Sequence, residues 1–290
     1  MLGKVAEIVS DRRSGSSQIA MNLLNYLVTA FSTEGEPPEA DQFLEELYAT
    51  VLRRRSLISP INLIEVLRRA HMLQRNEAGA ETPLKEAVLR LRELYGGALE
   101  VALRAGEERL TLYDTLLTLS KSSQVLSLVK RLPSVEVRVL TGWPLMDGLA
   151  AYAELRASGV KAFLFPDLSV FEAAEGVDAL LIGCDAILLD GSAVNRSGSK
   201  TAALVAEELG IPTIVICDST KLDLNSLWAP EKWSLASDEA SVEFQVFEKV
   251  DSRLVTEYVS ELGCLKPDKF VASAGSELVS SWPRRVARLL

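Results

Sequence analysis

The feature that most constrains the fold is a unit that repeats between residues 111 and 223: a short apolar run, a small polar loop and an amphipathic helix. The apolar runs include TLLTL, VEVRVL, KAFLF, ALLIGCDAILL and TIVI. Runs this short and apolar, each separated by one helical stretch, are typical of parallel strands that helices cover on both faces. We therefore predict an α/β fold, with a Rossmann-like, mainly parallel sheet domain over residues 111–263.

The residues before this domain follow a different period. From Ile19 onward, apolar residues recur three and four positions apart, which predicts a helical N-terminal domain over residues 1–110. We expect the helices to break at STEGEPPEAD, at Ser59-Pro60, at NEAGAETP and at Gly106. Residues 264–290 form a C-terminal tail with Trp282 and a basic end, which fits a partner-binding helix and a solvated terminus equally well.

Composition narrows the class of protein. Hydrophobic residues make up 48% of the 290 residues, which is enough to bury a core. The formal net charge of −9 argues against binding of nucleic acid over a broad surface, because such binding requires clustered Lys and Arg. Charged residues occur near the start, before any long apolar stretch, so we expect no signal peptide. No window approaches a run of about 18 uncharged apolar residues, so we expect no membrane span and a cytoplasmic location.

The cysteines and the histidine limit which metal sites and catalytic mechanisms the chain can support. Cys184, Cys217 and Cys264 lack CxxC spacing and a nearby histidine, so we expect three buried small residues, no metal site and no cofactor. The single histidine, His71, lies in a helical stretch and is expected to be partly exposed. One histidine excludes multi-histidine metal centres and makes a His-based triad improbable.

Ligands of parallel α/β sheets bind beyond the carboxyl ends of the strands. The candidate site residues therefore lie in the loops that follow the predicted strands, at 120–123, 141–148, 167, 185–200 and 218–223.

The segment 195–200 has the composition of an anion site. Gly198 allows close backbone approach, Ser199 and the first helical N–H groups can donate hydrogen bonds, and Arg196 and Lys200 supply positive charge. We expect Arg196 in an exposed loop. An ordinary N-capped helix after a turn explains the same residues equally well.

Residues 183–223 resemble the corresponding segment of one protein family. It contains the regulatory subunits of translation initiation factor 2B, methylthioribose-1-phosphate isomerase and ribose-1,5-bisphosphate isomerase. The family pattern GADxxxxNGxxxNKxGT, followed by a helix, a strand and a Lys-Phe-Asp turn, matches here at Gly183, Asp185, Gly191, Asn195, Gly198, Lys221 and Asp223.

The resemblance extends over all but about the last 25 residues. DRRSGSSQIA, TLLTLSKSSQVLSLVKRL and VRVLTGWPLMDG resemble segments of the archaeal members. It implies a helical domain followed by a Rossmann-like domain, and a dimer or larger assembly formed through the C-terminal domain. A ligand site would include Asp185, Gly191, Asn195, Arg196, Gly198, Ser199, Lys200 and Lys221.

The departures from the family pattern bear on activity. The isomerases use a cysteine and an aspartate where this chain matches with Ser120 and Ser192, and two family arginines match Trp143 and Leu149. An unassisted serine hydroxyl does not exchange protons near neutral pH as a thiol and a carboxylate do. We therefore expect no catalytic residue at these two degenerate positions.

Two hypotheses follow. In the first, the chain is a noncatalytic initiation factor 2B-like subunit that binds protein partners, such as initiation factor 2 or a paralogous subunit, and a phosphorylated metabolite or nucleotide. In the second, it is a sugar-phosphate aldose-ketose isomerase with an altered site. The residues at 120 and 192 favour the first.

Overall fold

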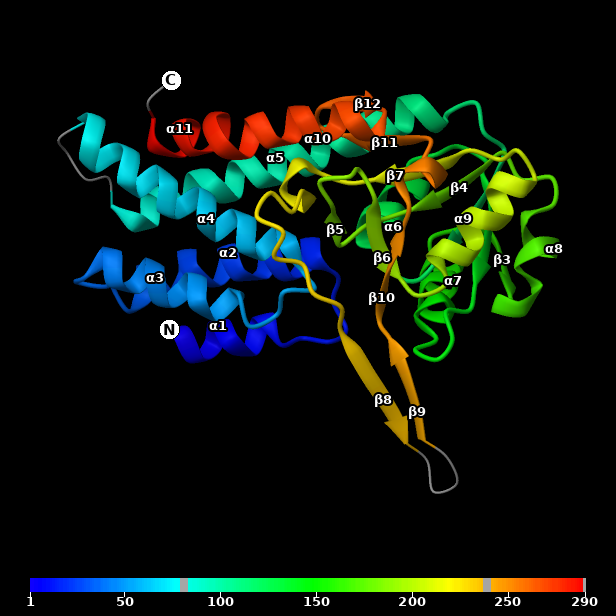
Figure 1. The fold of residues 1–290 in the computed structure, drawn as a ribbon, viewed down its shortest axis with the longest axis horizontal. Helices are drawn as coiled ribbons and strands as arrows, with labels where there is room; N and C mark the ends of the chain where they lie inside the picture. Colours follow the sequence, from blue (N-terminus) through cyan, green and yellow to red (C-terminus); the bar gives the residue numbers. More distant parts are fainter. Residues whose placement is uncertain (79–82, 237–240, 289–290) are drawn as a thin grey trace.

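The computed structural model describes residues 1–78, 83–236 and 241–288. Figure 1 shows a helical region at one end of the molecule and a sheet region at the other, with both chain termini at the helical end. The predicted fold class, a helical N-terminal region followed by an α/β region with a mainly parallel sheet, is confirmed.

The helical region is built around α2 (Ser16–Thr33), α4 (Ile58–Leu73) and α5 (Leu84–Leu110), which contact one another and bury leucines such as Leu23, Leu67 and Leu91. The Ser59-Pro60 pair lies in the first turn of α4, so the break falls just before it. The predicted break at NEAGAETP falls partly outside the described residues. The helices are α1 (Leu2–Val9), α2 (Ser16–Thr33), α3 (Ala40–Val51), α4 (Ile58–Leu73), the π-helix η1 (Gln74–Ala78) and α5 (Leu84–Leu110).

The predicted helix break at Gly106 is wrong, because α5 continues through this residue to Leu110. A β-carbon added at Gly106 would lie 2.6 Å from Leu128 Cδ2. Gly106 therefore allows α5 to pack closely against α6 (Ser123–Val129) and does not end the helix.

The main sheet has seven strands in the order β12-β11-β7-β4-β1-β2-β3, and every neighbouring pair is parallel except β11 with β12. Its strands are β1 (Thr115–Leu119), β2 (Glu136–Leu140), β3 (Lys161–Phe165), β4 (Ala179–Ile182), β7 (Thr213–Ile216), β11 (Glu257–Ser260) and β12 (Gly263–Leu265). The connecting helices are α6, α7 (Asp147–Ala157), the 3₁₀ turn η2 (Asp167–Ser169), α8 (Val170–Ala174), α9 (Ser199–Glu208) and the 3₁₀ turns η3 (Ser219–Lys221) and η4 (Ser252–Leu254).

A second sheet was not predicted. The apolar run ALLIGCDAILL divides at Gly183 into β4 and β5 (Ala186–Ile187), and β5 leaves the main sheet to pair with β6 (Ala193–Arg196). Strand β6 pairs in turn with β10 (Phe247–Val250). Residues 195 and 196, which we expected in a loop, therefore lie in a central strand of this sheet.

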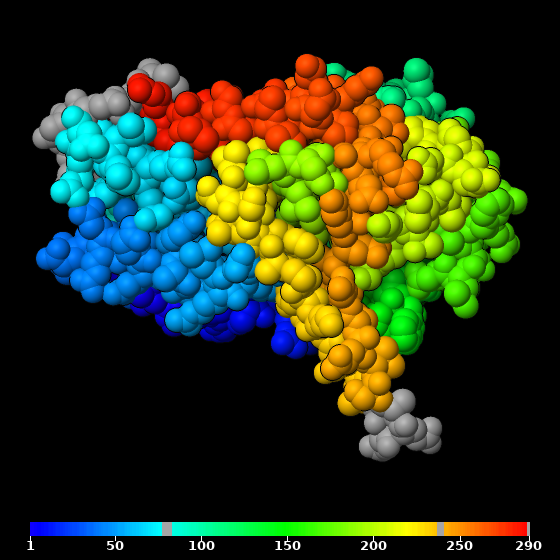
Figure 2. All heavy atoms as spheres, viewed as in Figure 1, coloured from blue at the N-terminus to red at the C-terminus, as the bar shows by residue number. Residues whose placement is uncertain are grey.

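A two-stranded hairpin projects from the molecule below the second sheet (Figures 1 and 2). It is formed by β8 (Lys232–Ala236) and β9 (Ser241–Gln245). The cross-strand pairs Trp233–Phe244 and Leu235–Val242 share one face, which makes that face apolar.

The C-terminal residues pack against the rest of the molecule. Strand β12 joins the main sheet, and α11 (Trp282–Ala287) lies on α4 and α5 after α10 (Pro267–Ser276) and the π-helix η5 (Glu277–Ser281). Phe270 and Trp282 are buried. The described part of the C-terminal segment is thus a docked helical element rather than a solvated end.

The cysteine and histidine environments differ in part from expectation. Cys184 and Cys217 are buried as expected, but Cys264 in the edge strand β12 is exposed. His71 lies in α4 as expected, yet it is buried, with Nε2 2.9 Å from Asp41 Oδ1. The helices among the described residues include none long and apolar enough to cross a membrane.

Candidate functional site

A polar pocket lies where the carboxyl ends of β1 and β4 meet the start of α2. We call it the Ser120 pocket. Segments from both regions of the molecule line it: Gly15–Ser17, Ser120–Gln124, Cys184–Asp185, Asn195–Arg196 and Lys221. Its cavity of about 30 Å³ has room for one or two water molecules. The structure therefore brings together eight residues of the sequence-predicted loops, namely Ser120, Lys121, Ser122, Ser123, Asp185, Asn195, Arg196 and Lys221.

Ser120 begins the loop between β1 and α6 and is 5% exposed. Its φ of 62° is in the left-handed region, which a non-glycine residue rarely adopts. Two residues later, Ser122 caps α6 by accepting a hydrogen bond from Val125 N at 3.4 Å. The serine-rich loop thus turns sharply at the end of the strand and places its hydroxyl groups along one wall of the pocket.

Asp185 joins the two regions of the molecule. Its Oδ1 accepts a hydrogen bond from Ser16 N at 3.0 Å, at the first residue of α2, and its main-chain N–H donates to Val194 O at 2.8 Å. A carboxylate at the start of a helix interacts favourably with the helix dipole. Asp185 therefore fixes the position of α2 over the sheet and forms one wall of the pocket.

Arg196 is not in an exposed loop, which corrects our expectation. It is the last residue of β6, its side chain is 13% exposed, and its guanidinium stacks 4.9 Å from the Phe247 ring centroid. Nε lies 3.3 Å from Asp147 Oδ2, and burial raises the pKa of Asp147, which the Arg196 charge opposes only in part. Nη1 of Arg196 is buried and has no hydrogen-bond partner among the described residues.

Lys221 is the second cation of the pocket and is 1% exposed. Asn62 of α4 holds its turn by donating from Nδ2 to the carbonyl oxygens of Thr220 and Leu222, each at 2.7 Å. Within the part of the chain that the structure describes, the Lys221 ammonium group makes no hydrogen bond or ion pair. A buried ammonium without a counter-ion favours the approach of an anion.

The start of α9, where we predicted an anion, already holds a carboxylate of this chain. Glu248 Oε1 accepts hydrogen bonds from Gly198 N at 2.7 Å and Lys200 N at 2.8 Å. The Lys200 ammonium pairs with Asp251 at 3.3 Å, and Ser199 Oγ donates to Arg196 O at 2.6 Å. An external anion would have to displace Glu248 to reach these groups.

Two further predicted positions lie outside the pocket lining. Ser192 is 1% exposed, and its Oγ accepts a hydrogen bond from Ser252 N at 3.2 Å. Gly191 has a φ of 78°, and its carbonyl accepts a hydrogen bond from Tyr258 Oη at 2.8 Å. Both residues shape the turn between β5 and β6.

Asp167, in a loop that we expected to carry site residues, holds the loop after β2. Its carboxylate accepts hydrogen bonds from Thr141 Oγ1 and from the main-chain N–H groups of Gly142 and Trp143, at 2.7–2.9 Å.

Sequence reasoning missed some of the lining residues. Ser16 and Ser17 come from the helical domain, where only the resemblance of DRRSGSSQIA to archaeal segments singled them out. Cys184 was read as a small apolar residue, yet it also lines the pocket. No local pattern could have shown that a helix start about 100 residues before the first strand would close the site.

The chain is similar in sequence to sugar-phosphate isomerases. The chain is 25% identical over 237 residues to the ribose 1,5-bisphosphate isomerase of Archaeoglobus fulgidus, covering 78% of this chain and 74% of the relative. It is 27% identical over 263 residues to the methylthioribose-1-phosphate isomerase of Symbiobacterium thermophilum, covering 83% of this chain and 71% of the relative.

Two solved structures share the fold. The translation initiation factor eIF-2B of Pyrococcus horikoshii superposes with a TM-score of 0.78 at 20% identity, covering 93% of this chain and 98% of that one. A chain of the tetrameric eIF2B-beta2-delta2 complex of C. thermophilum gives a TM-score of 0.68 at 17% identity, covering 95% and 93%. Residues 12–267 match the model of the initiation factor 2 subunit family. The chain therefore belongs to the initiation factor 2 subunit family.

Proposed function

We propose that this chain is a noncatalytic initiation factor 2B-like subunit that binds protein partners in translation initiation. The main support is that Ser120 and Ser192 occupy the positions at which the isomerases have a thiol and a carboxylate. Ser192 is buried outside the Ser120 pocket with its hydroxyl engaged by Ser252 N. Ser120 does line the pocket, but an unassisted serine hydroxyl does not exchange protons near neutral pH. A cytoplasmic location remains part of this proposal.

The size of the pocket limits which ligands it can hold in this conformation. Pockets that enclose organic ligands measure about 300–1,000 Å³. The Ser120 pocket measures about 30 Å³, so a pentose bisphosphate does not fit without movement of α2 or the β1–α6 loop.

An assay of aldose-ketose interconversion tests the absence of catalysis. Purified protein is expected to convert neither ribose 1,5-bisphosphate nor methylthioribose 1-phosphate above the uncatalysed rate. Turnover that Ser120→Ala abolishes, while the exposed Ser280→Ala leaves it unchanged, would overturn the proposal.

One observation favours the alternative function, a sugar-phosphate isomerase with an altered site. Cys184 and Asp185 bring a thiol and a carboxylate to the lining of the Ser120 pocket. If the alternative is right, the turnover in the same assay disappears in Cys184→Ser.

The pocket also retains features of a phosphate site, and we assign it a small phosphorylated ligand that enters when α2 or the β1–α6 loop moves. Arg196 and Lys221 supply two buried positive charges, and Asn195 and Asp185 lie beside them. A ligand at about 100 times its dissociation constant would stabilise the fold by about 2.7 kcal/mol.

Thermal shift with nucleotides and sugar phosphates tests the ligand. Lys221→Met keeps the length of the side chain and removes the charge, so it is expected to reduce the shift. Lys200→Met is the matched control, because Lys200 lies at the start of α9 and is paired with Asp251. Loss of the shift in Lys200→Met alone would place the ligand at α9 instead.

A pairing surface is expected at the β3 edge of the main sheet. Large apolar side chains are exposed on the elements next to this edge strand: Trp143, Met146, Leu149, Phe163, Leu168 and Phe171. Exposed apolar groups concentrated on one region mark association surfaces. Light scattering is expected to give at least twice the chain mass of 31.7 kDa, and Leu168→Glu to lower it. A monomer at micromolar concentration would refute the pairing.

A further inference from the structure

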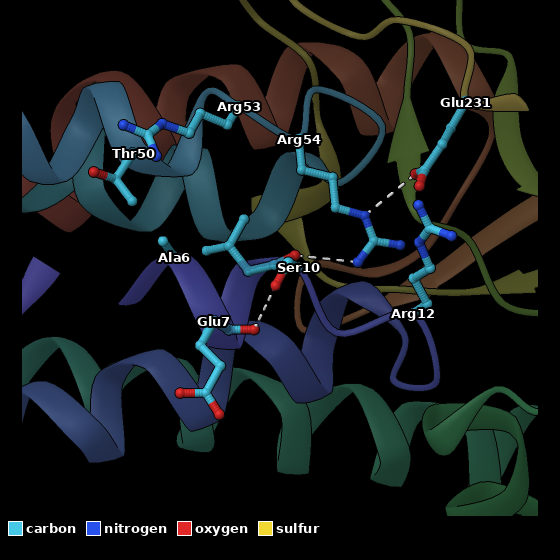
Figure 3. Close-up of a pocket in the computed structure, with 9 residues that line it drawn as sticks. Ala6, Glu7, Ser10, Arg12, Thr50, Arg53, Arg54 and Glu231 are labelled. Carbon is cyan, nitrogen blue, oxygen red and sulfur yellow. Dashed lines mark hydrogen bonds and ion pairs between the residues drawn. The ribbon is translucent and has the colours of Figure 1, made fainter. Parts of the chain in front are cut away.

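A second cleft lies between α1 and α3, beside the loop that leads into α2. Its volume is about 480 Å³, which is within the usual range for small-molecule sites, and it shares none of its lining residues with the Ser120 pocket. Figure 3 shows Arg12, Arg54 and Glu231 at one end of this cleft and Arg53 with Thr50 at the other. We call it the Arg12 cleft.

Arg54 is the most buried cation of the cleft, with its side chain 10% exposed. Nε donates to Glu231 Oε2 at 3.2 Å, and Nη1 donates to the carbonyl oxygens of Val9, at 3.2 Å, and Asp11. Nη2 is buried and has no hydrogen-bond partner among the described residues. Figure 3 shows this third nitrogen directed toward the Arg12 side chain. Because buried guanidinium N–H groups are normally paired, Nη2 indicates a place for an added acceptor.

The acidic residues of the cleft do not neutralise its other arginines. Glu231 is already engaged by Ser56, Trp233 and Arg54, and Glu7 pairs with Lys4 at 2.9 Å. Arg12 stacks 5.1 Å from the Trp233 ring centroid.

The side chains of Arg12 and Arg53 make no hydrogen bond or ion pair within residues 1–78, 83–236 and 241–288. Both side chains are exposed, so a ligand in the cleft can reach them. The cleft therefore carries positive charge that the described carboxylates do not neutralise.

The remaining wall of the cleft is partly apolar. Ala6 and Val9 form its apolar part, beside Glu7 and Ser10 of the same helix. The Thr50 hydroxyl is directed back to its own helix, where it donates to Glu46 O at 2.7 Å. A charged end and an apolar wall together select a ligand with an anionic group and an organic body. Two guanidinium groups match the charge and oxygen geometry of a phosphate dianion better than those of a single carboxylate.

We propose that the Arg12 cleft binds an organic phosphate monoester. The phosphate lies between Arg12 and Arg54, and the organic body lies against Ala6 and Val9. This site is separate from the ligand assigned to the Ser120 pocket, and it does not depend on whether that pocket is occupied.

Isothermal titration of the full chain with phenyl phosphate tests the proposal, with inorganic phosphate as the second probe. Phenyl phosphate is expected to bind more tightly, because only it can cover the apolar wall. Arg12→Ala removes one charge-assisted contact and is expected to weaken phenyl phosphate binding by about tenfold or more. Circular dichroism without probe checks that the variant is folded, and Arg53→Ala provides a second variant at the opposite end of the cleft, expected to weaken binding less.

Arg13→Ala is the matched control, because Arg13 is the exposed neighbour of Arg12 and does not line the cleft. If Arg13→Ala weakened phenyl phosphate binding as much as Arg12→Ala, the effect would come from overall charge and not from the cleft. That result would overturn the proposed site. Lys221→Met distinguishes the two pockets. Unchanged phenyl phosphate affinity in this variant supports the Arg12 cleft, whereas loss of binding would show that the probe binds in the Ser120 pocket and would overturn the proposal. Absence of binding at millimolar probe also overturns the proposal.

Discussion

Glu261 follows β11 and gives the fold a pH dependence that can be measured. Both carboxylate oxygens accept from Ser219 N, at 3.0 and 3.2 Å. Burial, together with the neighbouring charge of Asp218, raises the pKa of Glu261 from 4.5 to about 7, and the hydrogen bonds from Ser219 oppose this only in part.

The sign of the effect follows from the raised pKa. Between pH 4.5 and about 7, the unfolded chain has lost this proton while the folded chain keeps it. The folded state then binds more protons, so the free energy of unfolding falls as pH rises through this range. The pKa of Glu261 differs between 4.5 in the unfolded chain and about 7 in the folded chain. At about 1.4 kcal/mol per pH unit, this difference changes the free energy of unfolding by about 3 kcal/mol at full burial. Glu261 keeps some contact with water, so we expect about 1–3 kcal/mol.

Glu261→Gln removes the titration and keeps an oxygen that can accept from Ser219 N. Urea unfolding of both proteins at pH 5, 6, 7 and 8 is expected to show the wild type losing stability relative to the variant as pH rises. Any contribution from the sole histidine, His71, is common to both proteins and cancels in the difference. A difference that stays constant from pH 5 to pH 8 would refute the reasoning.

Three further predictions concern stability and are checked by urea unfolding. Gly148→Ala is expected to cost about 3 kcal/mol, because its β-carbon would lie 1.8 Å from the Leu140 carbonyl oxygen; a loss below 1 kcal/mol would contradict this contact. Trp282→Ala, in the docked α11, is expected to cost about 3–5 kcal/mol, and an unchanged midpoint would mean that this helix is not docked. Asp185→Ala is expected to cost about 1 kcal/mol by removing the acceptor for Ser16 N, whereas Asp185→Asn, which retains an oxygen, should lose less.

The sequence was most informative where the physical cause is local. The apolar runs predicted β1, β2, β3 and β7. Strands β1 and β7 are buried along almost their whole length, as strands covered on both faces require, whereas the edge strand β3 is exposed at Lys161 and Phe163. The helical period from Ile19 onward predicted the N-terminal helices after α1, because a helix that packs on one face repeats its apolar residues at this spacing. The failure at Gly106 has a local cause as well, since the pattern shows a glycine but not the Leu128 side chain that packs on it.

The candidate site was predicted only in part. Position in the loops after strands, together with the family resemblance, singled out Ser120, Asp185, Asn195 and Lys221, and these residues do line one pocket. The environment of Arg196 could not be predicted. Its burial depends on the pairing of β6 with β10, whose residues lie about 50 positions further along the chain.

The sequence by itself determined the class of fold, the alternation of helices with the strands of the main sheet, and the absence of an isomerase thiol and carboxylate at 120 and 192. These follow from residue identity and from periods of two to four residues. The tertiary structure alone decided which groups meet. It placed Glu248 on the start of α9, left Arg54 Nη2 without an acceptor among the described residues, and brought Arg12 beside Trp233 across 221 positions of sequence. Such pairs depend on how whole helices and strands pack, and no local pattern along the chain encodes them.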